Sequence, residues 1–371
     1  MNLSPKQKRQ ARAAGWLLRG PLGIPGICGI IAKYAKEFEG NCVRESLLPA
    51  VVRCIAVLPD RNECRSSFLL ASGSPDHIVR VWDVDRGTCV HTLAGHTGEM
   101  VALAALPDRK LASGSMDNTV RVWDVDSGAC VHTLAGHTSG VTALAVLPDG
   151  KLASSSFDDT VRVWDVDSGA CVHTLAGHTS GVSALAVLTD GKNVASGSFD
   201  KTVRIWDAAS GACLLTLAGH TNVVTDLAVL PKGKLASGSA DKTVRIWDAG
   251  NGDCLLTMSA HTNVLTALAI LPDGKLASGS ADMTIHVWDV ESGKCLLTLA
   301  DHTDVVADLT VLPDGKLASG SMDNTVRVWD SATGVCLLTL TDHVDWVCVL
   351  AVLPDGKLAS GSMDRTIRIW E

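Results

Sequence analysis

The chain has 371 residues, of which 46% are hydrophobic and 19% charged, with 40 acidic and 32 basic side chains. So large an apolar fraction can build a sizeable core and excludes an intrinsically disordered protein. The net charge of -8 makes nucleic acid a poor default partner, because a phosphate backbone requires clustered Lys and Arg. Since no uninterrupted apolar run is long enough to cross a bilayer, we expect no membrane span.

The chain begins with a basic extension, residues 1–40. Residues 1–36 contain seven Lys or Arg and no acidic residue, a bias typical of an organelle transit peptide, although Ser is scarce. Apolar residues at helical spacing predict an amphipathic α-helix over about residues 25–39: Ile27, Ile30, Ile31, Tyr34, Ala35 and Phe38. This helix either covers a patch of the domain that follows or binds a second protein.

From residue 41 onward the chain repeats a unit of about 41 residues. Each copy carries a Trp with an Asp six residues before it, and the Trp residues are Trp82, Trp123, Trp164, Trp206, Trp247, Trp288, Trp329 and Trp370. A unit of this size cannot bury a core alone, so neighbouring copies must share one. The repeat therefore predicts a single domain over residues 41–371 rather than two or three independent domains.

Each unit contains four short apolar segments separated by turn signals, which predict four strands. In the second unit these are residues 101–106, 110–115, 119–124 and 129–134. The last unit stops at Trp370 and lacks the fourth segment, whereas residues 41–47 match that segment but precede the first unit. We therefore expect residues 41–47 to complete the last unit, which would close a ring and remove its exposed edges.

On these motifs the chain resembles the WD-repeat β-propeller family over about residues 41–371. The matching motifs are the Gly-His pair, as in Gly136-His137, the Ser-Gly-Ser strand, the turn Asp, and the Trp-Asp pair that ends the third strand. The resemblance and the eight Trp copies imply an all-β, eight-bladed propeller, closed by an N-terminal strand and preceded by a short α-helical extension. Seven blades, the commoner number in the family, would leave one copy unplaced.

In this family the repeated polar residues form a hydrogen-bonded chain from indole through hydroxyl and imidazole to carboxylate. Such a chain satisfies buried polar groups that each need a partner. Ser, His and Asp also form hydrolytic triads, but a catalytic set is needed once, and seven equivalent histidines favour a structural role. The first unit has Leu48-Pro49 in place of the histidine, which predicts a weak point. The structural sets we single out are His137, Ser154 (with Ser156 as an alternative), Asp158 and Trp164, and His220, Ser237, Asp241 and Trp247.

Eight of the twelve cysteines occupy one equivalent position in each unit. Blade spacing places these positions roughly 15 Å apart, whereas a disulfide needs Cα atoms within about 7 Å. We expect small, buried, reduced side chains, which indicates a reducing compartment such as the cytoplasm. Because the sequence shows no metal-ligand spacing, Gly-rich phosphate loop or unique acid–base pair, we predict no catalytic residue, no metal and no cofactor. The eight cysteines are Cys42, Cys89, Cys130, Cys171, Cys213, Cys254, Cys295 and Cys336.

Residues that depart from the repeat are the candidates for partner binding. The resemblance places the residue before each turn Asp near the central opening of the top face, where Met116, Phe157, Phe199, Met322 and Met363 would form an apolar patch. These side chains either bind a partner or fold inward and plug the channel. In the loop after each histidine, Glu99, Trp346 and Asp345 are further candidates, since Trp is a typical hot-spot residue, although Trp346 could instead fill a gap between blades. We expect the insertion from Arg61 to Ser67 to place Arg61 and Arg65 on the opposite face, as a solvated loop.

These features favour a non-enzymatic, monomeric scaffold that binds a protein or peptide on the top face. One alternative is a substrate-receptor subunit of a ubiquitin ligase acting through the N-terminal helix, since a helix before a propeller is weakly similar to an F-box remnant. That similarity rests on one helix, where an F-box needs about three. A third alternative, from a different class, is a cryptic enzyme.

Overall fold

The computed structural model describes residues 42–58 and 68–371. The basic extension, the helix expected over residues 25–39 and the insertion from Arg61 to Ser67 lie outside these residues. The part of the chain that the structure describes contains no helix with the length and apolarity of a membrane span.

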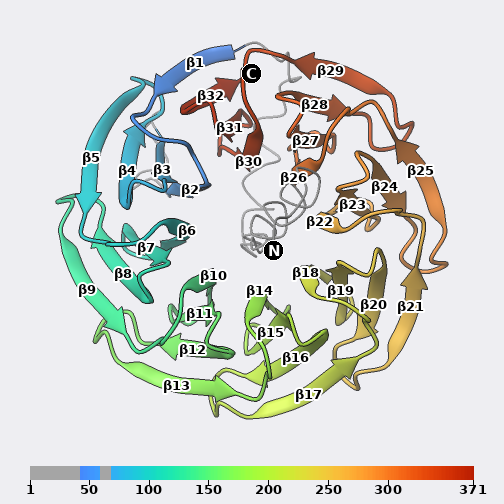
Figure 1. The fold of residues 1–371 in the computed structure, drawn as a ribbon, viewed down its shortest axis with the longest axis horizontal. Coiled ribbons are helices and arrows are strands. Elements are labelled where there is room, and N and C mark those ends of the chain that lie inside the picture. The colour runs from blue at the N-terminus through green and yellow to red at the C-terminus, as the bar shows by residue number, and fades with distance from the viewer. Residues whose placement is uncertain (1–41, 59–67) are drawn as a thin grey trace, which may run out of the picture.

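The described residues form eight four-stranded antiparallel sheets, arranged as blades around a common axis (Figure 1). The predicted eight-bladed propeller is confirmed. Within a blade the strands follow the chain from the innermost to the outermost, so each unit of about 41 residues makes one sheet. In the second unit the predicted strands fall within one residue of the observed ones, because turn residues mark both ends of each strand.

Blades 1 to 4 comprise β2–β5 (Cys54–Leu58, Leu69–Gly73, Ile78–Asp83, Thr88–Ala94), β6–β9 (Met100–Leu106, Lys110–Ser115, Thr119–Asp124, Cys130–Ala135), β10–β13 (Val141–Val146, Leu152–Ser156, Thr160–Trp164, Cys171–Ala176) and β14–β17 (Val182–Val187, Asn193–Ser198, Thr202–Asp207, Cys213–Ala218). Blades 5 to 7 comprise β18–β21 (Val224–Leu230, Lys234–Ser239, Val244–Asp248, Cys254–Met258), β22–β25 (Leu265–Ile270, Leu276–Ser280, Ile285–Trp288, Cys295–Leu299) and β26–β29 (Val306–Val311, Leu317–Ser321, Val326–Trp329, Cys336–Leu340). Blade 8 comprises β30–β32 (Val347–Val352, Leu358–Ser362, Thr366–Trp370) and β1 (Cys42–Leu47).

The two ends of the described chain meet in blade 8, where β1 lies beside β32 (Figure 1). The pairing is antiparallel and sets Cys42 opposite Trp370 and Leu47 opposite Thr366. β1 therefore supplies the outermost strand that the last unit lacks, as the sequence predicts. The pairing satisfies the backbone groups of β32 and leaves no unfinished blade in the ring.

The core lies between blades rather than within them, since each sheet is covered on both faces. Trp206 of blade 4, for example, is 1% exposed and packs with Val163 and Leu147 of blade 3. The strands are correspondingly apolar on both faces, as sandwiched sheets require. A blade cannot bury its own Trp without its neighbour, so the ring must form as a whole.

The expectation that the eight repeated cysteines are buried is wrong, since six are exposed and the other two, Cys42 and Cys336, are half-buried. Those in β5, β9, β13, β17, β21 and β25 are exposed, because the outermost strand of a blade has solvent rather than another strand beyond it. None of the ten cysteines in the described residues is in a disulfide. The exposed cysteines are Cys89, Cys130, Cys171, Cys213, Cys254 and Cys295.

Candidate functional site

A buried hydrogen-bonded chain links β12, β11, the loop before β10 and the top turn of blade 3. The indole Nε1 of Trp164 donates to Ser154 Oγ at 2.7 Å, and Ser154 Oγ lies 2.8 Å from Nε2 of His137. Nδ1 of His137 lies 2.8 Å from Oδ2 of Asp158. Because the indole can only donate, the Ser154 proton points to Nε2, and Nδ1–H of His137 then donates to the carboxylate.

The same geometry recurs in blades 2 to 8. In blade 5 Trp247 donates to Ser237 at 2.8 Å, and His220 lies 2.7 Å from Ser237 and 2.8 Å from Asp241. The serine that takes part is the one at the Ser154 position, while Ser156 instead donates to the carbonyl of Ser139. Seven blades thus use the set for one task, which is to pair polar groups that the inter-blade core has removed from water.

A threonine two residues after the turn Asp is a fifth member of the set that sequence reasoning missed. In blade 3 Thr160 Oγ1 donates to Asp158 Oδ1 at 2.6 Å, and the backbone N–H of Thr138 donates to Oδ2 at 2.9 Å. The signal was available, because Thr follows the Asp at this spacing in blades 2 to 8. The carboxylate therefore accepts hydrogen bonds on both oxygens.

These contacts shift the titration of both partners. Burial alone would raise the pKa of Asp117, but hydrogen bonds from Thr119, Thr97 and His96 outweigh burial and lower the pKa to about 2. The pKa of His96 is lowered from its ordinary value of 6.5, because burial outweighs the attraction of Asp117. The folded protein therefore holds an anionic carboxylate against a neutral imidazole.

This arrangement does not offer the nucleophile of a hydrolytic triad. Ser154 has no exposed surface, and its oxygen already accepts the indole N–H of Trp164. A triad serine must instead reach a substrate carbonyl in a cleft. The geometry is that of a structural network.

In blade 1 other residues fill the position of the missing histidine and bond the turn Asp. Leu48 is 3% exposed and packs in the same apolar cluster as Trp82, which still donates to Ser72 at 2.8 Å. Arg80 Nη2 donates a hydrogen bond to Asp76 Oδ2 at 2.7 Å, where the other blades have an imidazole as the donor. The carboxylate thus keeps a partner, and the weak point expected at this seam stays a prediction.

In most blades the residue before the histidine lies next to an arginine of the third strand, and we call the two a Gly–Arg match where that residue is Gly. At Gly95 an added Cβ would lie 2.8 Å from Nη1 of Arg121, so the guanidinium occupies the space above the glycine. Equivalent Gly–Arg pairs occur in blades 3, 4 and 5. In blades 7 and 8 the Gly is replaced by Asp301 and Asp342, whose carboxylates lie 3.8 Å from Arg327 and Arg368.

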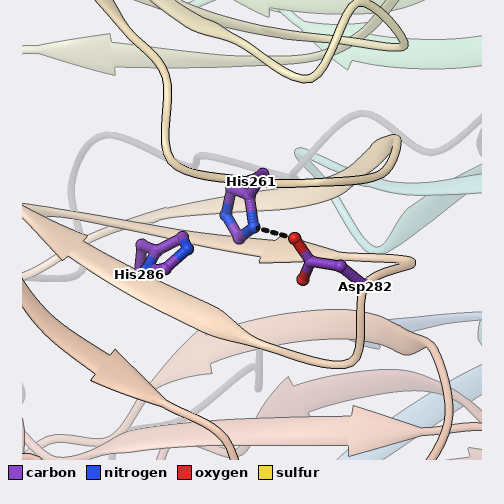
Figure 2. Close-up of side chains that lie close together, drawn as sticks. All are labelled: His261, Asp282 and His286. Carbon is purple, nitrogen blue, oxygen red and sulfur yellow. Dashed lines mark hydrogen bonds and ion pairs between the residues drawn. The ribbon is translucent and has the colours of Figure 1, made fainter.

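Blade 6 breaks this match at both positions. Ala260 replaces the glycine, and His286 replaces the arginine and lies 5.4 Å from Trp288 between ring centroids. The ring centroids of His261 and His286 are 4.1 Å apart, and Figure 2 shows the two imidazoles side by side with Asp282. Burial and the neighbouring His261 lower the pKa of His286 to about 4.

Three of the predicted partner-binding residues form a continuous strip on the top face, the face that carries the turns before the third strand of each blade. Met116 of blade 2 lies over Gly140 of blade 3, and Phe157 of blade 3 lies over Gly181 of blade 4. Phe157 and Phe199 lie 5.9 Å apart between ring centroids. Met116 is 38% exposed, and both Phe rings are half-buried. We call Met116, Phe157 and Phe199 the apolar strip.

Four of the remaining predicted residues lie on the other side of the ring, in blades 7 and 8, whereas Glu99 lies in blade 2 beside Met116: the four are Met322, Met363, Trp346 and Asp345. Met322, Met363 and Trp346 are half-buried, and Met363 N–H donates to the Trp346 carbonyl at 2.9 Å. Asp345 is exposed beside Val344, which is 79% exposed. Glu99 forms an ion pair inside the propeller, because its carboxylate lies 2.7 Å from Nη1 of Arg53.

Comparison with known proteins agrees with the fold and the network. The family model described as "WD domain, G-beta repeat" matches the chain eight times, at residues 40–83, 87–124, 128–165, 169–207, 211–248, 252–289, 293–330 and 334–371. The chain therefore belongs to the WD-repeat family, whose propellers generally act as non-enzymatic interaction scaffolds.

Individual relatives match over short stretches. The chain is 49% identical over 45 residues to the F-box-like/WD repeat-containing protein TBL1X of Mus musculus and to Ribosome assembly protein 4 of Chaetomium thermophilum. Each match covers 12% of this chain, and 8% and 9% of those proteins respectively. The crystal structure of the computationally designed Ika8 protein is similar over 90% of this chain and 98% of its own, with 32% identity and a TM-score of 0.77.

Replacing Ser154 by Ala tests the network. The change leaves the Trp164 indole and His137 Nε2 buried without their partner, so we expect a loss of about 1–3 kcal/mol in the free energy of unfolding. Urea unfolding followed by tryptophan fluorescence measures it. Asp159→Asn is the matched control, because asparagine occupies this turn position in blades 2 and 7, as Asn118 and Asn324. Equal stability of the two variants would contradict the role of Ser154.

The pKa shifts predict that acid weakens the fold in two steps. His96, His137 and His178 have pKa values lowered from 6.5, so the unfolded chain binds more protons and stability falls as the pH drops below 6.5. Asp117 and Asp200, each with a pKa of about 2, lose their contribution as the pH falls from 3.8 toward 2. A melting temperature that stays constant from pH 7.5 to pH 3 in a circular-dichroism series would refute this prediction.

Proposed function

We propose that the protein is a non-enzymatic scaffold whose top face binds an extended peptide segment of a protein partner through apolar side chains. The apolar strip is the observation that supports this most directly. Three large apolar side chains lie end to end across blades 2 to 4 with part of their surface open to solvent. Soluble proteins usually reserve such a contiguous patch for a partner.

The glycines beneath the strip keep it shallow and continuous. At Gly140 an added Cβ would lie 2.5 Å from Met116 Sδ, and at Gly181 it would lie 2.9 Å from a ring carbon of Phe157. A larger residue at either position would push the strip side chain away from the blade surface. Blades 2 and 5 to 8 carry Glu, Val or Trp at this position, so the glycines occur where the Met116 and Phe157 side chains need the space.

The chemistry of the strip suits an adaptable anchor site. Met fits irregular apolar partners, while aromatic rings supply large contact area at small entropic cost. Trp346 and the exposed Val344 offer a second apolar point on the top face. A peptide that reaches both would cross the mouth of the ring.

The ligase-receptor alternative has weaker support. Relatives with F-box or SCF names align over short stretches, from 42 residues (11% of this chain) for the probable SCF subunit sconB of Arthroderma otae to 60 residues (15%) for the F-box/WD repeat-containing protein sel-10 of Caenorhabditis elegans. Such stretches are about as long as one repeat unit or a little longer, so the similarity is one between repeats. Because the repeated thiols are exposed and none is in a disulfide, we also propose a reducing location such as the cytoplasm.

Peptides selected from a phage-displayed random library on the purified chain would test the scaffold function. We expect them to carry apolar anchors and to bind the double variant Phe157→Ala/Phe199→Ala at least about 10-fold more weakly, since truncation of hot-spot residues costs 2 kcal/mol or more. Fluorescence polarisation measures the affinity. Alanine is a native residue at this position in blades 5 and 6, as Ala240 and Ala281, so the fold should tolerate the change.

Leu214→Ala is the matched control, because Leu214 is 48% exposed but lies on the outermost strand β17. It should leave binding unchanged. Undiminished affinity in the double variant, or loss of affinity only in Leu214→Ala, would refute the assignment of the function to the top face.

A further inference from the structure

Blade 6 brings together three side chains that can ligate a metal ion. His261 lies in the loop before β22, Asp282 in the turn between β23 and β24, and His286 on β24 (Figure 2). One ligand atom from each lies within 4.8 Å of those of the other two. His261 and His286 are 7% and 6% exposed, and Asp282 is half-buried toward the top face.

This cluster exists because of the break in the Gly–Arg match. In every other blade a guanidinium stands where His286 lies, and in blades 2 to 5, 7 and 8 its positive charge opposes a cation at the neighbouring His–Asp pair. His286 removes that charge and adds an imidazole, a ligand that zinc favours. The arginines at this position are Arg80, Arg121, Arg162, Arg204, Arg245, Arg327 and Arg368.

The three side chains are already held by outer hydrogen bonds. Ser278 Oγ lies 2.8 Å from His261 Nε2, and Thr284 Oγ1 donates to Asp282 Oδ1 at 2.6 Å. Thr298 Oγ1 lies 3.0 Å from His286 Nδ1, and Cys295 Sγ lies 3.4 Å from the same nitrogen. Such outer partners fix ring orientation and are a regular feature of metal sites.

We propose that blade 6 binds one zinc ion through His261, Asp282 and His286. The ion takes the place of the hydrogen bond between His261 Nδ1 and Asp282 Oδ2, a pair of atoms 2.9 Å apart, and the imidazole proton moves from Nδ1 to Nε2, which then donates to Ser278 Oγ. Zinc bonds of about 2.0–2.2 Å separate tetrahedral ligands by about 3.3 Å. The His261–Asp282 pair therefore needs little change, while His286 rotates toward them and solvent supplies the remaining ligand. The ion would tie the top turn of blade 6 to β24 and stabilise that blade.

The test compares the full chain with the double variant Ala260→Gly/His286→Arg. The variant restores the Gly–Arg pair of blades 2 to 5, so it should fold, and it keeps all twelve cysteines. Titration with zinc chloride alone, followed by calorimetry and native mass spectrometry, should show one ion bound by the unaltered chain. Affinity in the variant should fall at least about 10-fold, the smallest effect expected for disturbing a metal site. Equal zinc binding by both proteins would assign the metal to the thiols and overturn the proposal.

A second variant tests whether the two substitutions suffice. Asp301→Ala/Arg327→His gives blade 7 the same pair beside its own His302 and Asp323. We expect a second zinc equivalent in this protein and a rise in its melting temperature on adding zinc. A stoichiometry that stays at one would overturn the assignment of the site to this pair of positions.

Discussion

The structure depends on pairing the indole N–H of a Trp that each blade must bury against its neighbour. The apolar surface of Trp206 or Trp164 is the largest single contribution to each inter-blade core, yet its N–H cannot be buried unpaired without a cost of about 1–3 kcal/mol. Serine accepts that hydrogen bond and donates its own hydroxyl proton to a hydrogen bond with histidine. The histidine N–H in turn donates a hydrogen bond to aspartate. The chain of donors ends on a carboxylate that three further donors stabilise at the top turn, as at Asp158.

This requirement explains why the blades are so alike and why the ring must close. Each network draws its histidine from the loop that arrives from the preceding blade, so His137 of blade 3 follows directly on β9 of blade 2. Neighbouring blades therefore share polar contacts as well as apolar ones. β1 completes blade 8 from the other end of the chain and removes the last open edge.

Sequence periodicity predicted the closing strand and the recurrent polar residues, and the resemblance to WD-repeat propellers added their hydrogen-bonded network. Periodicity works here because turn residues and Trp recur at a fixed spacing, and spacing is what a sequence displays. The exposure of the cysteines was predicted wrongly, because Cys130 falls in the fourth predicted strand and the spacing alone does not show that the outer side of this strand faces solvent. The hydrogen bond from Arg80 to Asp76, which replaces the imidazole in blade 1, could not be predicted either. It depends on the direction in which the Arg80 side chain extends, and residue spacing does not encode that direction. The pairing of Ala260 with His286 became interpretable only when the structure set the two positions against each other.

We propose that partner binding uses the residues that the network leaves unconstrained. The residue before the turn Asp can be Ala, Met, Phe or Pro without disturbing the carboxylate, and three of these variable positions carry the apolar strip.

Hydrogen exchange of the eight buried indole N–H groups, followed by NMR, tests the account most directly. We predict that they exchange only as the whole ring unfolds. Indole exchange at the rate of a solvent-exposed tryptophan, in a chain whose strands remain protected, would contradict it.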